Sequence, residues 1–233
     1  QLKWLPRIVI VDSYSTDDTL QLAGKFSNTD IYKRAFDDHT TQWNYGLQKT
    51  EIESEWILAM DADYYIPEAL SKEIRGKIEA NPAENAFWLR FNYAIDGEII
   101  RSGIYPPVQA LYRRKHAVYK PDGHTQRVVI SGNSGSLAEK AIHDDRKPLS
   151  RWLQSQLNYT DLEAQKLRAS EYGSLNRKDR LRLNHKCIPF LVFIYCIFIR
   201  SGWKDGRYGW LYAFQRLIAE VLLQYKLIQQ RIN

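Results

Sequence analysis

The segment WILAMDADYYIP, residues 56–67, is an apolar run that ends on two carboxylates. Asp61 and Asp63 close the run with only one alanine between them. The run predicts a buried β-strand over residues 56–63, in which side chains at positions i and i+2 point the same way. Pro67 suits the first turn of a helix, and residues 67–79 have the pattern of one. We therefore expect the two carboxylates to converge where a buried strand ends.

Strand and helix patterns alternate on the N-terminal side of this segment. The patterns predict two strands and two helices: strands over residues 7–12 and 29–36, and helices over 15–26 and 40–49. Ser15, with Asp18 three residues later, matches a capping box at the start of the first helix. This alternation predicts an α/β fold with a Rossmann-like, mixed but mainly parallel sheet flanked by helices.

The middle of the chain has a different pattern. Residues 87–95 alternate with period two and end at Asp96-Gly97, a hairpin turn signal. Further extended segments follow over residues 108–114 and 126–131, and a helical pattern begins at Leu149. We expect an α/β domain over residues 1–148 and a helical C-terminal region over 149–233.

Charge is distributed unevenly between these two parts. Residues 1–145 carry 17 Lys and Arg against 21 Asp and Glu, whereas residues 146–233 carry 16 against 6. A uniformly basic protein would suggest nucleic acid, which we do not expect as a partner here. The basic part also contains the apolar helices, and this combination points to an anionic membrane surface.

Two apolar helices are predicted within the C-terminal region. Residues 187–199 are uncharged over 13 positions, fewer than the roughly 20 that a membrane-spanning helix needs. An amphipathic pattern with basic residues covers 208–231. The pattern favours a membrane-associating region, although a helical hairpin packed on the α/β domain would have the same pattern. The cysteines, Cys187 and Cys196, are poor evidence for a disulfide, which favours a reducing, cytosolic setting.

The two aspartates after the apolar run predict a cation site. In an open α/β sheet, ligands bind beyond the carboxyl ends of the strands, and two carboxylates there repel unless a cation balances them. Mg²⁺ or Mn²⁺ bound to phosphate oxygens would supply that balance. The alternative is a pair of aspartates that merely ends a strand and caps the next helix. Asp12 ends another predicted strand, and its turn offers hydroxyls and backbone N–H groups.

Three segments together resemble the family 2 glycosyltransferases, which are inverting enzymes of the GT-A fold. They are VIVDSYSTDDT (9–19), QWNYGL (42–47) and WILAMDADYYIP. Residues 104–128 and 142–167 resemble the lipopolysaccharide-core and exopolysaccharide branch of that family. The resemblance implies transfer of a sugar from a nucleotide-sugar, with a UDP-sugar expected, to a saccharide or lipid-linked acceptor in cell-envelope polysaccharide biosynthesis. It also implies a Mg²⁺ or Mn²⁺ cofactor and a cytoplasmic location, peripheral on the inner face of the cell membrane.

The resemblance assigns roles to residues that match the family's motifs. Those expected to bind the nucleotide-sugar come from all three segments: Asp12, Ser13, Ser15, Asp17, Asn44 and Asp61. Two are expected to hold the metal: Asp63 and His143. Three are expected on the acceptor side: Tyr105, Gln109 and Arg113.

The resemblance leaves the catalytic base less defined. Gln126 occupies a position where some relatives have a glutamate, and a glutamine cannot accept a proton. Asp122 is therefore the expected base, although it could be only a turn residue, and Asp144 and Asp145 are the alternatives.

Two departures from the family pattern lead to other hypotheses. The family begins with a strand of the type V-[ST]-x-x-[IV]-x-x-[KY]-N-E, which this sequence lacks, so we expect an N-terminally truncated domain. With Gln126, this favours the alternative of a degenerate relative that binds nucleotide or a membrane partner without turnover. A nucleotidyltransferase is a third hypothesis, but we find no Gly-rich phosphate loop with a basic residue.

Overall fold

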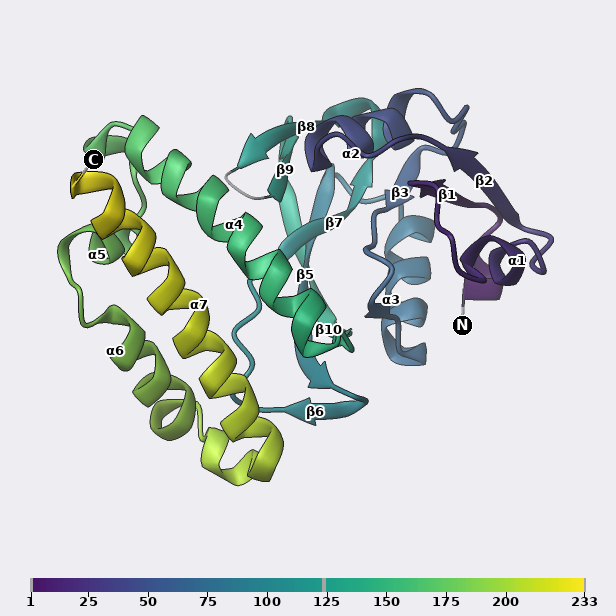
Figure 1. Ribbon diagram of the computed structural model, residues 1–233. Coiled ribbons are helices and arrows are strands. Elements are labelled where there is room, and N and C mark those ends of the chain that lie inside the picture. Colours follow the sequence, from purple (N-terminus) through teal and green to yellow (C-terminus); the bar gives the residue numbers. More distant parts are fainter. Residues whose placement is uncertain (1, 123–124, 233) are drawn as a thin grey trace.

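One mixed sheet forms the centre of the fold (Figure 1). The structure is a computed structural model that describes residues 2–122 and 125–232. In spatial order, the strands of this sheet are β3 (Trp56–Leu58), β7 (Val108–Arg113), β5 (Ala86–Ile95), β10 (Ser134–Asp145) and β4 (Tyr64–Tyr65), and β6 (Glu98–Ile100) pairs with β5. Only β5 and β10 run parallel, while the other neighbours are antiparallel.

The sheet is therefore mixed, as predicted, but the prediction of a mainly parallel sheet is wrong. The prediction extended the strand–helix alternation of the N-terminal third to the whole domain. No helix connects β5, β6 and β7 in the described residues, and strands joined without a crossover helix pair antiparallel. The predicted turn at Asp96-Gly97 is present, and both residues have the positive φ that such a turn requires.

Two smaller sheets lie beside the central one. β1 (Ile8–Asp12) and β2 (Thr29–Lys33) form a parallel pair, joined through α1 (Thr19–Ala23). β8 (Ala117–Asp122) and β9 (Thr125–Ile130) form an antiparallel hairpin that packs against α2 (His39–Gln48). The buried residues Leu47, Tyr112 and Tyr119 hold α2, β7 and β8 together.

The main core lies between the central sheet and α3 (Glu68–Glu79), which begins after Pro67 as expected. Leu70 and Ile74 of α3 are fully buried against Phe87, Leu111 and Leu137 of three strands. Complete burial of such side chains stabilises the fold by about 1.5–3 kcal/mol each. This packing fixes the connection between β3 and α3, which contains Asp61 and Asp63.

Three local predictions differ from the structure. The strand predicted over 56–63 ends at Leu58, and the helix predicted over 15–26 covers only Thr19–Ala23. Ser15 does not cap that helix, because its backbone N–H and hydroxyl both bond the Asp12 carboxylate. β10 was not predicted at all.

The C-terminal part is helical, as predicted. It contains α4 (Leu149–Ala169), α5 (Arg177–Asn184), α6 (Ile188–Ile194), a π-helical turn (Tyr195–Ile199), a 3₁₀ turn (Gly202–Asp205) and α7 (Gly206–Ile232). Figure 1 shows α4 and α7 side by side, with α6 next to α7. Within residues 2–122 and 125–232, no helix combines the length and apolarity that crossing a bilayer requires.

A shared core joins these helices to the sheet. Ile95 of β5 and Ile100 of β6 pack against Ile197 and Tyr212. Asp205 adds a polar link, since its Oδ2 accepts hydrogen bonds from the Arg101 and Ser102 backbone N–H groups at 2.8 and 3.0 Å. The Ser102 hydroxyl donates a third bond to the same oxygen, at 3.1 Å.

We predict that Asp205→Ala lowers the free energy of unfolding by about 3 kcal/mol, because three donors lose a charged acceptor in a largely buried position. Asp205→Asn keeps one acceptor oxygen, so its free energy of unfolding should fall clearly less than that of Asp205→Ala. Urea denaturation of both variants measures the difference. Equal losses for the two variants would contradict the assigned role of Oδ2.

Candidate active site

Asp61 and Asp63 lie in the turn that connects β3 to β4, not on a strand. The backbone fixes this turn at two points. Tyr64 N donates to Asp61 O, and Asp144 N of β10 donates to Asp63 O, both at 3.1 Å. The expected strand geometry for the two carboxylates is therefore wrong, yet both still reach one cavity because β10 holds the turn in place.

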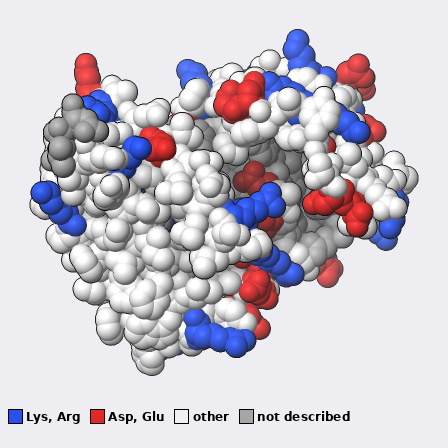
Figure 2. All heavy atoms as spheres, viewed as in Figure 1, with Lys and Arg blue, Asp and Glu red and all other residues white. Residues whose placement is uncertain are grey.

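This cavity has a volume of about 350 Å³ and lies between the turn, β10 and the C-terminal helices. Asp61 and Asp63 line it together with His143 and Asp145 of β10, and α4 and α7 form the opposite wall. Figure 2, viewed as in Figure 1, shows a hollow with acidic and basic residues in it. A cavity that combines carboxylates, a histidine and cations is suited to a charged ligand.

His143 and Asp63 form the central contact of the cavity. The Nε2 atom of His143 lies 3.1 Å from Oδ2 of Asp63. Two atoms of this pair, Asp63 Oδ1 and His143 Nδ1, are buried without a hydrogen-bond partner in the described part of the chain. Such buried polar atoms usually have a partner, which a water, an ion or a ligand in the cavity would supply.

The pKa values of the two aspartates shift in opposite directions. Burial raises the pKa of Asp61, and the negative charge of Asp63 adds to this, although solvent reaches the Asp61 side chain through the cavity. Burial also opposes ionisation of Asp63, but its hydrogen bond to His143 and the charges of His143 and Lys147 outweigh burial and lower its pKa. Asp63 is therefore the carboxylate that remains ionised more readily.

Tyrosine rings surround His143. The ring centres of Tyr93 and Tyr105 lie 5.0 and 4.3 Å from that of His143. The hydroxyls of Tyr64 and Tyr105 are 2.7 Å apart. Burial raises the pKa of Tyr105 to about 12, so its hydroxyl stays protonated. These rings restrict the imidazole orientation and leave hydroxyl groups near the carboxylates.

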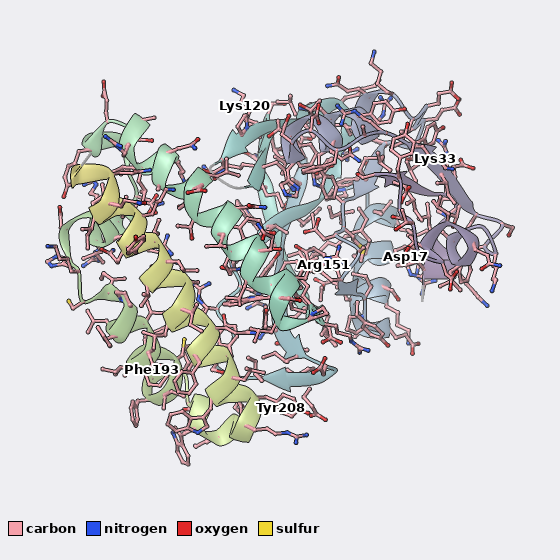
Figure 3. The ribbon with its side chains drawn as sticks, in the orientation of Figure 1. Asp17, Lys33, Lys120, Arg151, Phe193 and Tyr208 are labelled. Atoms are coloured by element: carbon pink, nitrogen blue, oxygen red, sulfur yellow. The ribbon has the colours of Figure 1, made fainter. Side chains whose placement is uncertain are left out.

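A second hollow of about 430 Å³ adjoins the first, and both are lined by Asp63, Asp145 and Lys147. It extends to Arg151 at the start of α4. The pKa of Asp17 is lowered by hydrogen bonds from Thr19 and, to a smaller extent, by the charge of Arg151. Figure 3 shows Asp17 in the N-terminal part of the molecule and Arg151 near the start of α4. Arg151 therefore lines the hollow beside Asp63, and its positive charge makes a small contribution to the lowered pKa of Asp17.

The Asp12 turn does not line either cavity. The buried Asp12 carboxylate accepts from the Ser15 N–H at 3.0 Å and from the Ser15 hydroxyl at 2.5 Å, which lowers its pKa. Ser13 accepts a hydrogen bond from Gln42 Nε2 at 3.2 Å. These contacts shape an exposed loop, and its nucleotide-binding role remains a prediction.

Three other predicted residues are engaged elsewhere. Asn44 joins α2 to β8, because its Nδ2 donates to Tyr119 O and its Oδ1 accepts from Tyr119 N, both at 3.0 Å. Gln109 donates to Ser134 Oγ at 2.8 Å. Arg113 pairs with Glu55 and its guanidinium lies over the Trp56 ring. Of the three predicted acceptor-side residues, only Tyr105 lines the cavity.

Asp122, the expected base, does not line the cavity either. Its carboxylate pairs with Arg127 and lies 3.0 Å from Lys166 Nζ. Burial opposes its ionisation, but Lys166 and Arg127 outweigh burial and lower its pKa, which makes it a weaker proton acceptor. Asp145, by contrast, lines the cavity, and its Oδ1 lies 3.5 Å from Lys147 Nζ. The geometry favours Asp145 over Asp122.

Two basic residues that line the cavity, Lys147 and Arg216, were not among the predicted site residues. Lys147 Nζ lies 4.0 Å from Asp63 Oδ2 and 3.5 Å from Asp145 Oδ1. Arg216 of α7 lines the cavity from the opposite wall, with Nη2 3.3 Å from Glu220 Oε1. Lys147 lies two residues after the Asp144-Asp145 pair, which could have marked it, whereas Arg216 is one of several basic residues in an amphipathic helix and nothing in the local sequence distinguishes it.

The family profile described as "Glycosyl transferase family 2" matches residues 4–134. The chain belongs to glycosyltransferase family 2. The match includes the Asp12 turn, the turn with Asp61 and Asp63, and the β8–β9 hairpin. It ends at the first residue of β10, so nearly all of β10 and the C-terminal helices, which supply much of the cavity, lie outside the match.

Crystal structures of S. aureus TarS have a distant likeness to this family member. The structure of its residues 1–349 in complex with UDP is 15% identical, covers 96% of this chain and 82% of that chain, and gives a TM-score of 0.43. A longer TarS structure is 16% identical, with coverage of 94% and 49% and a TM-score of 0.42. Among curated proteins, none matches the chain significantly.

We predict that Asn44→Ala lowers the free energy of unfolding by about 2 kcal/mol, because two backbone groups of Tyr119 lose their partners. Binding of nucleoside diphosphates by the folded variant should stay at the wild-type level. Chemical denaturation and isothermal titration calorimetry measure the two effects. A stable variant with weakened nucleotide binding would instead support the role implied by the family resemblance.

Proposed function

We propose that this glycosyltransferase moves a sugar from a nucleotide-sugar, with a UDP-sugar as the first candidate, to a hydroxyl group with inversion. The observation that carries the proposal is the convergence of Asp61, Asp63 and His143 on one cavity, with unpaired polar atoms on Asp63 and His143. A saccharide or lipid-linked acceptor of cell-envelope polysaccharide synthesis is the proposed second substrate. The reaction would take place on the cytoplasmic side of the membrane.

The chemistry of the residues fits a divalent cation bound together with a diphosphate. The described residues contain no group of three or more His, Cys, Asp or Glu side chains suited to a metal ion. Mg²⁺ at phosphate sites usually takes only one or two protein carboxylates, and phosphate and water oxygens complete its shell. Asp63, with its unpaired Oδ1, and Asp61 supply that number, and His143 lies beside them.

A bound Mg²⁺ or Mn²⁺ would act as a Lewis acid that neutralises charge developing on the diphosphate. The chain supplies the other groups. Lys147 places positive charge beside Asp63, and Arg216 adds a cation on the opposite wall of the cavity, and both attract phosphate oxygens. Asp145 would accept the proton of the acceptor hydroxyl while the new C–O bond forms at the anomeric carbon. The bond to the diphosphate breaks in the same displacement, and the electron pair leaves with the phosphate oxygen.

Asp63→Asn should lower sugar-nucleotide turnover about 100-fold or more, because the ion and the diphosphate lose their main carboxylate. The measurement is Mn²⁺-dependent release of nucleoside diphosphate from a panel of nucleotide-sugars. Glu53→Gln is the matched control, since Glu53 is an exposed acid outside the cavity and should not affect turnover.

Each outcome of that assay distinguishes between the hypotheses. Turnover that is lost in Asp63→Asn and kept in Glu53→Gln supports the transferase. Nucleotide binding without turnover in the folded wild type favours the degenerate relative. Turnover that does not change in Asp63→Asn would rule out the assigned role of this carboxylate.

A second comparison tests the choice of base. Asp145→Asn should lower kcat about 100-fold or more through loss of the proton acceptor. Asp122→Asn should leave kcat close to wild type and instead reduce stability at neutral pH. Because the folded-state pKa of Asp122 lies below its unfolded value, its contribution is present above the unfolded pKa of about 3.9 and disappears as pH falls through the folded value. Loss of kcat in Asp122→Asn alone would restore Asp122 as the base.

A further inference from the structure

The helices α6 and α7, with the turn between Tyr195 and Ile199, present a broad apolar surface to solvent. We define the α6–α7 face by its exposed apolar residues: Phe190, Leu191, Ile194, Phe198, Ile199, Leu211, Phe214, Ile218, Val221, Tyr225 and Ile228. Several of these side chains are more than 60% exposed, and Ile199 reaches 70%. Large contiguous apolar patches of this kind are rare on soluble proteins and mark interaction sites.

The spacing on α7 shows that this exposure follows a continuous stripe. The exposed residues of α7 recur at intervals of three and four from Leu211 to Ile228, which places them on one side of the helix. At 1.5 Å per residue the stripe is about 25 Å long. The other side of α7 is buried, with Tyr212, Ala213 and Leu223 in the protein core. The helix is therefore apolar on two sides, and packing within the chain accounts for only one.

Aromatic contacts join the stripe of α7 to α6. The Phe193 ring lies 6.1 Å from that of Trp210 and 5.2 Å from that of Phe214. Figure 2 shows the surface over α6 and α7 as almost free of charged residues, in contrast to the opposite half of the molecule. The two helices thus form one surface and not two separate strips.

Within residues 186–233, the exposed charged side chains are all basic. Residues 186–233 contain seven Lys and Arg but only two acids, Asp205 and Glu220. Both acidic side chains are buried, 5% and 3% exposed, and hydrogen bonded within the chain. Lys186, Lys204 and Arg207 are exposed. Exposed positive charge without exposed negative charge complements an anionic surface.

We infer that the α6–α7 face binds the headgroup region of an anionic lipid bilayer. The exposed apolar stripe of α7 and the exposed cations beside it suit helices that lie along a bilayer surface. Exposed Trp203 and Trp210, with tyrosines nearby, belong to the residue types that concentrate at membrane–water interfaces. The inference uses only residues outside the proposed catalytic groups, so its failure would leave the proposed reaction untouched.

The opposite side of α7 reaches the cavity. Tyr212, Gln215, Arg216 and Ala219 line it, while Leu211, Phe214 and Ile218 face outward. Bilayer and cavity would thus be separated by about 10 Å, the diameter of one helix.

The test is cosedimentation of the full chain with vesicles. The wild type should bind vesicles of equal parts phosphatidylcholine and phosphatidylglycerol more strongly than vesicles of phosphatidylcholine alone. The double variant Phe198→Gln/Ile199→Gln should bind at least about tenfold more weakly, because each side chain loses its burial in lipid. Leu22→Gln/Phe26→Gln is the matched control, because both residues are similarly exposed on the N-terminal side.

A second pair of variants tests the charges. Lys204→Gln/Arg207→Gln should weaken binding to the anionic vesicles by about tenfold or more, since each cation near the surface contributes about 1 kcal/mol. Lys3→Gln/Lys25→Gln removes two exposed cations elsewhere and should have no effect. Thermal unfolding of every variant confirms that it is folded.

Two results would overturn the inference. One is a folded wild type that binds neither kind of vesicle. The other is a stable dimer, seen by analytical ultracentrifugation, that Phe198→Gln/Ile199→Gln dissociates without any change in vesicle binding. That second result would make the α6–α7 face an interface between two copies of the chain.

Discussion

The antiparallel pairing of β4 with β10 determines the geometry of the candidate site. Only two residue pairs connect these strands, Ile142 with Tyr65 and His143 with Tyr64, and they fix the turn that precedes β4. The pairing brings Asp63 into contact with His143, a residue 80 positions later in the chain. β10 is itself held by its parallel pairing with β5 along the centre of the sheet. A shift of β10 by one residue would turn His143 away from Asp63, because strand side chains alternate between faces.

The sequence revealed the elements that local chemistry decides and missed those that depend on distant partners. The apolar residues before Asp61, and Pro67 before α3, predicted a strand and a helix on either side of the carboxylates, although that strand ends at Leu58 and the carboxylates lie in the turn that follows. β10 was missed because its segment SLAEKAI contains strong helix formers, Leu, Ala, Glu and Lys. Its partners β5 and β4 impose the strand, since tertiary pairing overrides weak local preference. Without β10, the proximity of His143 and Asp145 to the turn could not be derived from the residues.

Residue roles were harder to predict than positions. Asp122 has the sequence environment of a turn residue, and nothing near it in the chain indicates that Lys166, 44 positions later, pairs with it. The same holds for Asn44, whose amide is satisfied by the Tyr119 backbone. In both cases a polar side chain that could bind a ligand is already paired within the fold. Such pairing lowers its availability for a ligand, because a new contact must replace an existing hydrogen bond.

The C-terminal helices influence the catalytic cavity as well as the surface. α7 supplies Arg216 to the cavity on one side and an apolar stripe to solvent on the other. Its position depends on Asp205 and on the core formed with β5 and β6. Binding of a bilayer to the outer side of α7 would therefore involve a helix that also forms a wall of the cavity. α7 therefore lies between the α6–α7 face, for which we infer bilayer binding, and the cavity, for which we propose the reaction.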